Sequence, residues 1–127
     1  MIANFADLLK MASSQEQPQR LLLLFAHAES ARKKASKKQR GTITPVMCVD
    51  KLPEEIDSFE ALVAEADSIN TGWNFIIIAG LSGNQGKAPT PEEADPYLNQ
   101  MVNGLAAGES LSRYIVFDRE QSPILMQ

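Results

Sequence analysis

The sequence is poor in the side chains that most metal centres and redox sites need. Its 127 residues include one cysteine, Cys48, and one histidine, His27. A lone cysteine cannot form an intramolecular disulfide, and one cysteine with one histidine gives no recognisable zinc-ligand spacing. We therefore expect no bound metal and no cofactor, and the cysteine content fits a reducing compartment.

Long hydrophobic stretches are also missing. The longest apolar runs, Leu21–Ala26 and Phe75–Leu81, are far shorter than the ~20 residues that a membrane-spanning helix requires. Residues 1–11 contain Asp7 and no basic segment ahead of an apolar one, so they do not resemble a signal peptide. These patterns predict a cytoplasmic protein without membrane contact.

The remaining composition is that of an ordinary globular domain. Hydrophobic residues make up 44% of the chain and charged residues 22%, both typical values. A chain of this length buries roughly two-thirds of its unfolded-state surface, which is enough for one core. Residues 1–127 are therefore expected to form a single domain.

Positive charge is concentrated in one short segment. The net charge is -4, but half of the 12 basic residues lie between positions 32 and 40. They are Arg32, Lys33, Lys34, Lys37, Lys38 and Arg40. Residues 29–41 have no apolar face to bury, so we expect a flexible basic loop. Binding of nucleic acid or of an acidic protein is the alternative, but no aromatic side chain for base stacking lies among these cations.

Hydrophobic periodicity predicts three helices and four or five strands. An amphipathic helix is expected near the N-terminus, a second from Pro53 to Ile69, and a third between Thr90 and Gly108, where Pro96 predicts a kink or a second start. Strand-like runs cover 20–29, 42–50, 73–81 and 114–117, and 124–126 fit a short edge strand. Pro45 has no N–H to donate, which predicts an edge position or a bulge in the second strand.

The order of these elements favours an α/β layered sandwich with a four- to five-stranded, largely parallel or mixed sheet and three helices. Leu21–Phe25 is continuously apolar, as in strands that are buried on both faces of a parallel sheet. The strand at 42–50, the helix after it and the strand at 73–81 have the lengths of a parallel crossover. This fold depends on an assumed direction for the first strand.

Polar side chains at the carboxyl ends of the strands form one candidate site, because ligands bind outside these ends in parallel sheets. The polar residues there are His27, Glu29, Cys48, Asp50, Lys51, residues 82–87, Asp118 and Arg119. A nucleophilic enzyme would use Cys48 as the thiolate and His27 as the base, with Asp50 or Glu29 orienting the imidazole. Packing of Cys48 within an apolar strand is the commoner outcome for a small thiol.

The loop Leu81–Ala88 invites comparison with the phosphate-binding motif G-x-x-x-x-G-K-[ST]. That motif needs glycine first and a hydroxyl last, whereas this loop has Leu81 and Ala88 at those positions. A nucleoside-triphosphate site is therefore not expected. Free backbone amides, a lysine and the next helix N-terminus could still hold a small anion. The candidate anion-binding residues are Ser82, Gly83, Asn84, Gly86 and Lys87.

Four segments carry a resemblance to a known family. They are Pro18–Leu22, Pro45–Lys51, the Trp73 strand with its Leu81-Ser82-Gly83 ending, and Phe117–Arg119. On these segments the chain resembles, over nearly its whole length, a family of small bacterial proteins with no established activity, some of them labelled ribonucleotide reductase subunit alpha. That reductase needs a thiyl-forming cysteine and a redox-active cysteine pair, and this chain has Cys48 alone. We therefore reject ribonucleotide reduction as its activity.

These observations favour a binding or protein-interaction module. Its partner is expected to be an unidentified protein or small molecule, and an edge strand or helix face could form a homo-oligomer. Two alternatives stay open. One is a small enzyme that uses His27, Cys48 and Asp50, and the other is weak nucleic-acid binding through residues 32–40.

Overall fold

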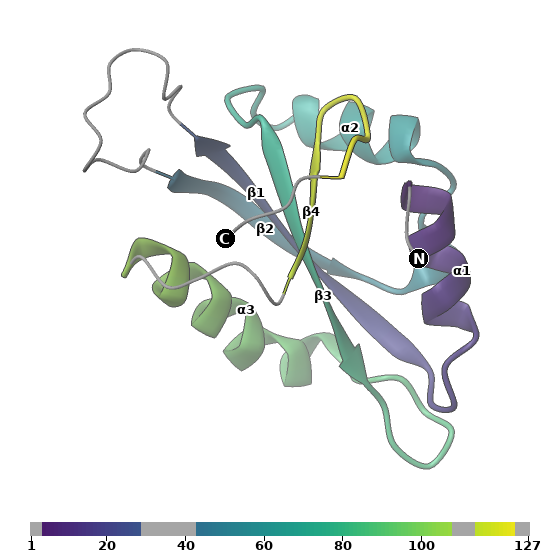
Figure 1. The fold of residues 1–127 in the computed structure, drawn as a ribbon. Helices are drawn as coiled ribbons and strands as arrows, with labels where there is room; N and C mark the ends of the chain where they lie inside the picture. The colour runs from purple at the N-terminus through teal and green to yellow at the C-terminus, as the bar shows by residue number, and fades with distance from the viewer. Residues whose placement is uncertain (1–3, 29–42, 108–113, 124–127) are drawn as a thin grey trace.

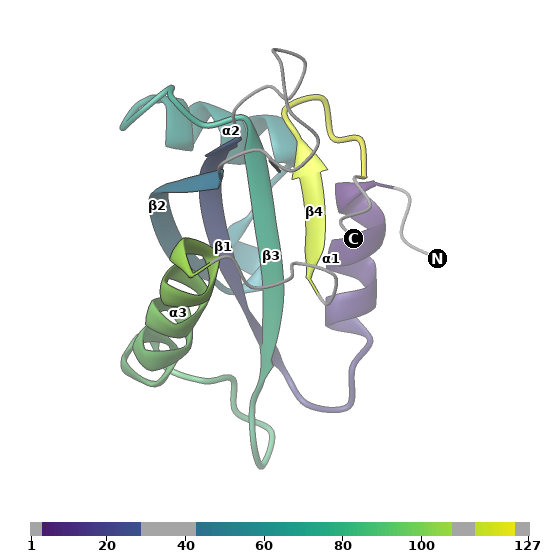
Figure 2. The same ribbon diagram turned by 60° about the vertical axis from the view of Figure 1, so that its left-hand side comes forward.

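The computed structural model describes residues 4–28, 43–107 and 114–123. These residues form a four-stranded sheet with helices on both faces (Figures 1 and 2). The strands are β1 (Gln19–Ala28), β2 (Ile43–Lys51), β3 (Phe75–Ser82) and β4 (Ile115–Asp118). The helices are α1 (Phe5–Ser13), α2 (Phe59–Asp67) and α3 (Pro91–Ala106), with a short 3-10 turn at Pro53–Glu55. Helices α1 and α2 cover one face of the sheet, and α3 covers the other.

Every pair of neighbouring strands in the described part of the chain is antiparallel, in the order β2-β1-β3-β4. The prediction of a largely parallel or mixed sheet is therefore wrong. Strands β2 and β3 do run in the same direction, as the predicted crossover required, but β1 lies between them and pairs with both. A continuous apolar run indicates burial on two faces, and burial does not fix the direction of a strand's neighbours.

Strand β1 supplies both halves of the hydrophobic core. The residues from Leu21 to Ala26 are each at most 3% exposed. The odd-numbered side chains of this run pack with α1 and α2, whereas the even-numbered ones pack with α3. Because successive side chains of a strand point to opposite faces, an uninterrupted apolar run needs helices on both sides of the sheet.

The second helix begins later than Pro53. Ser58 is its N-cap, and its side chain accepts a hydrogen bond from the Ala61 amide at 3.0 Å. Pro53–Glu55 instead forms the separate 3-10 turn. The predicted start is therefore wrong, because proline followed by glutamates also suits the first residues of a 3-10 turn.

The third helix runs through Pro96 without a second start. Proline at this position deprives only the Glu92 carbonyl of its helical N–H partner, and Glu92 is exposed, so water can bind that carbonyl. Pro45 has the predicted setting, since β2 is a sheet edge and its register with β1 shifts at Pro45. The basic loop at 29–41 and the edge strand at 124–126 lie outside the described residues. None of the described helices is long and apolar enough to cross a membrane.

Two-sided burial of β1 can be tested by shortening one leucine on each face. Leu23 and Leu24 are 0% and 1% exposed, so Leu23→Ala and Leu24→Ala should each lower the free energy of unfolding by about 2–5 kcal/mol. Urea denaturation measures both losses, with exposed Thr44→Ala as the control. A loss for only one of the two leucines would indicate a sheet with one solvent-exposed face.

Candidate functional site at the open half of strand β3

Antiparallel pairing separates the residues of the predicted strand-end site. Strands β1 and β3 run in opposite directions, so His27 lies at one end of the sheet and Ser82 at the other. Within the β1–β2 pair, His27 is opposite Thr44, whereas Cys48 is opposite Leu24. Three strand residues span about 10 Å. Cys48 also shares the α3 face with Leu24, while strand alternation directs His27 to the other face, so the two side chains form no Cys–His dyad.

Cys48 has surroundings that disfavour a thiolate. Its pKa is raised above the ordinary value, first by partial burial and then by the negative charges of Asp95 and Asp50. A nucleophilic cysteine needs the opposite shift, which a nearby cation or a helix N-terminus would provide. The thiol is exposed but stays largely protonated at neutral pH.

Asp50, the third candidate catalytic residue, is bound to Arg20. The Arg20 Nη1 lies 2.6 Å from Asp50 Oδ2, and the Arg20 Nε donates to the Pro89 carbonyl at 2.6 Å. Arg20 is 8% exposed, so its charge is held inside the fold. This arginine joins β1, β2 and the segment that leads into α3. Sequence reasoning missed it, although a cation directly before a buried leucine run is a signal for such a partner.

Arg119 likewise has structural partners. Its Nη2 contacts both carboxylate oxygens of Asp67, at 2.9 and 2.7 Å, and its Nη1 donates to the Trp73 carbonyl at 3.1 Å. The guanidinium also lies 4.0 Å from the centroid of the Trp73 ring. These contacts join the ends of α2 and β4 to the start of β3. Two of the predicted strand-end residues, Asp50 and Arg119, therefore act as cross-links of the fold.

The candidate anion loop is a tight hairpin in which four backbone amides are already bonded. Asn84 and Lys87 exchange two backbone hydrogen bonds, of 2.9 and 3.0 Å, around Gln85 and Gly86. The Gly83 amide donates to the Pro18 carbonyl, and the Gly86 amide donates to the Gln17 side chain. The N-terminus of α3 is capped by the reciprocal bonds of Thr90 and Glu93. Anion binding by this loop stays a prediction, although the amides of Gly83, Asn84, Gly86 and Lys87 already have partners within the fold.

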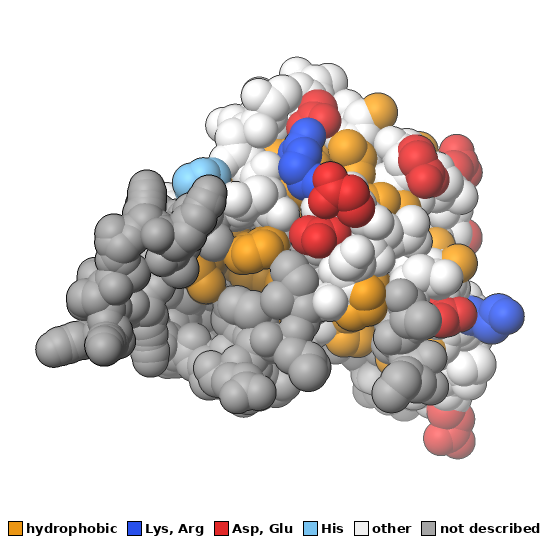
Figure 3. All heavy atoms as spheres, turned by 45° about the horizontal axis from the view of Figure 1, so that its top comes forward, with side chains coloured by type: hydrophobic (Ala, Val, Ile, Leu, Met, Phe, Trp, Pro, Cys, Tyr) orange, Lys and Arg blue, Asp and Glu red, His pale blue; other side chains and the backbone are white. Residues whose placement is uncertain are grey.

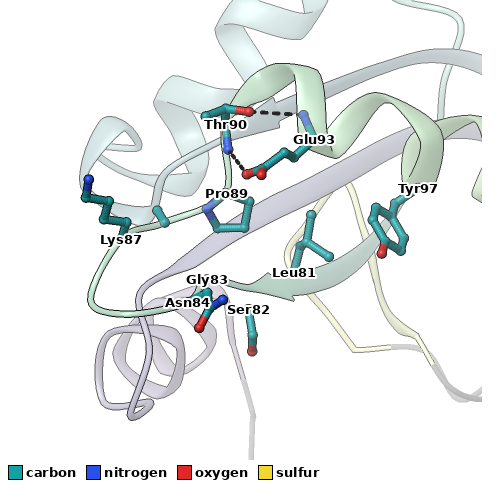
Figure 4. Close-up of a pocket in the computed structure, with 10 residues that line it drawn as sticks. Leu81, Ser82, Gly83, Asn84, Lys87, Pro89, Thr90, Glu93 and Tyr97 are labelled. Atoms are coloured by element: carbon teal, nitrogen blue, oxygen red, sulfur yellow. Dashed lines mark hydrogen bonds between the residues drawn. The ribbon is translucent and has the colours of Figure 1, made fainter.

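A hollow of about 510 Å³ opens between the end of β3 and the start of α3. We call it the α3-side hollow. It is lined by Leu81, Ser82, Gly83, Asn84, Lys87, Ala88, Pro89, Thr90, Glu93 and Tyr97. Figure 4 shows Leu81 and Tyr97 beside the space, whereas Lys87 lies at the far side with its ammonium directed away from Leu81. The lining of the hollow therefore combines apolar side chains, such as Leu81, with polar ones, such as Lys87 and Glu93.

A second hollow lies on the opposite face of the same strand. This α1-side hollow has a volume of about 240 Å³. It is lined by Leu8, Met11, Ala12, Gln15, Gln19, Leu21, Ile78, Ala79, Gly80 and Ile115. The two hollows thus flank the stretch Ala79–Ser82 from the two faces of the sheet.

The same stretch has one open edge. Strand β4 pairs with Phe75–Ile78 only, whereas β1 pairs with β3 as far as Ser82. Within the described ranges, no strand pairs with Ala79–Ser82 on the side away from β1. We call Ala79–Ser82 the open half of β3.

Hydrogen-bond alternation identifies which groups face that edge. The Gly83 amide bonds to the Pro18 carbonyl on the β1 side, and residues of an antiparallel strand alternate between their two neighbours. The odd-numbered residues of β3 therefore bond to β1, and the even-numbered ones face β4. Gly80 and Ser82 consequently direct their N–H and C=O groups outward, beyond the first residue of β4.

Charge is unevenly distributed over the described surface. Only five of the 12 basic residues lie in the described ranges, against 14 of the 16 acidic residues. Three of those five, Arg20, Lys51 and Arg119, are held in ion pairs. Figure 3 shows acidic side chains outnumbering basic ones on the face seen from the top of Figure 1. The basic patch at 32–40 lies outside the described residues.

Comparisons with known proteins identify no family. The chain matches no family model, no curated protein and no solved structure. The described residues also contain no group of three or more His, Cys, Asp or Glu side chains placed to hold a metal ion. The resemblance based on the four segments therefore stays a prediction.

Removal of the Asp50 carboxylate tests its structural role. Asp50→Ala leaves the buried Arg20 charge without its partner, which should cost about 3–5 kcal/mol of unfolding free energy. Arg20→Met removes the buried charge together with the penalty of desolvating it, so it should lower the free energy of unfolding by less. Urea denaturation of the two variants, with exposed Asp57→Ala as the control, measures the difference. Equal stability of Asp50→Ala and the natural protein would contradict this role.

The reactivity of Cys48 tests its electrostatic surroundings. Because Asp95 raises the pKa of the thiol, Asp95→Asn should lower that pKa, increase the thiolate fraction and speed alkylation by iodoacetamide at pH 7. Rates measured from pH 6 to 10 should give a Cys48 profile that is shifted to higher pH than that of an unstructured cysteine peptide. Glu92→Gln provides a control on the same helix. A profile shifted to lower pH would instead support the nucleophile hypothesis.

Proposed function

We propose that this protein is a protein-interaction module that accepts an extended segment of another protein along the open half of β3. The observation that carries this proposal is the outward main chain of Gly80 and Ser82, placed between two hollows. An added strand would pair with Gly80 and Ser82, on the side of β3 away from β1.

Main-chain groups favour a strand as the occupant. The N–H and C=O groups of Gly80 and Ser82 are spaced to form ladder bonds with an extended chain, which is the basis of strand addition to an exposed sheet edge. Side chains of such a segment alternate between the two faces. One would enter the α1-side hollow and the next the α3-side hollow, which adds specificity to the main-chain bonds.

The two edges of the sheet differ in how they are protected. The β2 edge carries Pro45, a register shift and Lys51, all of which discourage pairing with another strand. The open half of β3 carries Ala79, Gly80, Leu81 and Ser82, and none of these blocks pairing. This contrast supports β3 as the edge that a partner uses.

The other functions have less support. An enzyme that uses His27, Cys48 and Asp50 lacks a dyad, and its thiol has a raised pKa. Nucleic-acid binding would rely on residues 32–40, and no specific observation on the described residues favours it. A cytoplasmic location and homo-oligomer formation stay predictions.

A proline in the open half tests the proposal. Ser82→Pro removes one outward N–H and leaves the bonds to β1 in place, because proline is tolerated where the N–H of an edge strand faces solvent. Random octapeptides displayed on phage are selected against the full chain, and the affinities of the enriched peptides are measured by fluorescence polarisation. We expect Ser82→Pro to weaken binding about tenfold or more, since one hydrogen bond is lost and the proline ring obstructs the added strand.

Ser82→Ala is the matched control, because it loses the hydroxyl and keeps the N–H, and it should bind peptides like the natural chain. Urea denaturation confirms that both variants fold. Failure to enrich any peptide, or equal binding to Ser82→Pro, would overturn the proposal. Sedimentation measures self-association in parallel, and a dimer that Ser82→Pro dissociates would mean that a second copy, not a separate partner, occupies the edge.

A further inference from the structure

Resting on the proposed strand addition, we infer that Gly80 determines the specificity of the site. The residue of the bound segment that lies opposite Gly80 is a large aliphatic one, and its side chain occupies the α1-side hollow. Residues directly opposite each other in a sheet point to the same face. Gly80 alternates with Ala79 and Leu81, which pack on the α3 side, and it lines the α1-side hollow itself.

The fold accounts for two glycines near this edge but not for Gly80. A Cβ on Gly83 would lie 1.9 Å from the Lys87 carbonyl oxygen, and Gly86 has a φ of +78°. A Cβ on Gly80 would meet only the end of the flexible Gln19 side chain, at 3.1 Å, and its φ is not in the left-handed region. Glycine weakens a strand interior, and it often marks a site where a ligand or another backbone approaches closely.

The lining of the α1-side hollow indicates the class of side chain that fits there. Each of its ten lining residues is uncharged, and Gln15 and Gln19 are the only polar ones. Leu8, Leu21 and Ile78 belong to the buried core behind it. A charged side chain would lose its hydration here without an opposite charge, whereas an aliphatic one would gain by burial. The larger α3-side hollow, with Lys87, Glu93 and Tyr97 on its lining, accepts polar or aromatic neighbours.

A graded series at position 80 tests this inference. Gly80→Ala and Gly80→Val progressively fill the α1-side hollow, while Gly72→Ala and Gly72→Val are matched controls. A Cβ on Gly72 also meets a flexible amide, the Asn70 side chain at 3.0 Å, but lies before β3. The probes are octapeptides selected on the natural chain. We expect Gly80→Val to bind them about tenfold to hundredfold more weakly than the natural chain does. The affinity of Gly80→Ala should lie between those of Gly80→Val and the natural chain, and the Gly72 variants should bind like the natural chain.

The reciprocal experiment changes the peptide and does not depend on the stability of a variant. Replacing the conserved aliphatic residue of a selected peptide by alanine should weaken its binding to the natural chain by a similar factor. The same replacement should weaken binding to Gly80→Val much less. Fresh selection on Gly80→Val should enrich alanine or glycine at that peptide position.

Two different failures are distinguishable. Peptides that depend on the Ser82 amide but show no aliphatic preference, or that bind Gly80→Val normally, would overturn this inference and leave the proposed function standing. Peptides that bind Ser82→Pro as well as the natural chain would overturn both.

Discussion

The burial of β1 on both faces is the constraint on which the rest of the structure depends. A run from Leu21 to Ala26 has no side that tolerates water, so helices must cover both sides of the sheet and strands must flank both edges. Strand β3 has the same requirement over Ile76–Ile78, where each residue is at most 2% exposed. The helices are therefore divided between the faces, with α1 and α2 on one and α3 on the other. Arg20 ties this central strand to β2 and to the approach to α3.

The candidate site is a consequence of unequal strand lengths within this arrangement. Strand β3 extends as far as its partner β1 requires, while β4 ends its pairing at Ile78. Helices that pack against a sheet cannot satisfy the hydrogen-bonding groups along its edge, because those groups lie in the plane of the sheet. Among the described residues, the outward amides and carbonyls of Gly80 and Ser82 therefore have no strand partner, whereas Phe75–Ile78 pair with strands on both sides.

Local sequence patterns predicted most helices and strands, because the pattern that indicates an element lies within the residues of that element. The leucine run located β1, the Thr90–Glu93 pair marked the start of α3, and Pro45 indicated an edge or a bulge. Strand direction was predicted wrongly, because burial on two faces looks the same in parallel and antiparallel sheets.

The site was only partly predictable from the sequence. Residues 82–87 were singled out for their resemblance to an anion loop, whereas the structure puts Ser82 and Lys87 on the lining of the α3-side hollow. Gly80 was missed, although a glycine within an apolar strand is a signal that sequence reasoning can use. The carboxylate partners of Arg20 and Arg119 lie 30 and 52 residues away in the sequence. A local sequence pattern does not indicate contacts between residues so far apart.

The placement of β1 between β2 and β3 also has a consequence for synthesis on the ribosome. Strand β1 pairs with β2, the next strand along the chain, but its other neighbour, β3, ends at Ser82. When β1 and β2 have emerged from the ribosome but β3 has not, the leucine-rich β1 therefore has one unpaired edge. That edge stays unpaired until α2 and β3 have also emerged. At translation rates of roughly 5–20 residues per second this interval lasts a few seconds. During that interval the strand at the centre of the finished sheet is the segment most exposed to misassociation, and it is the one a chaperone would have to shield.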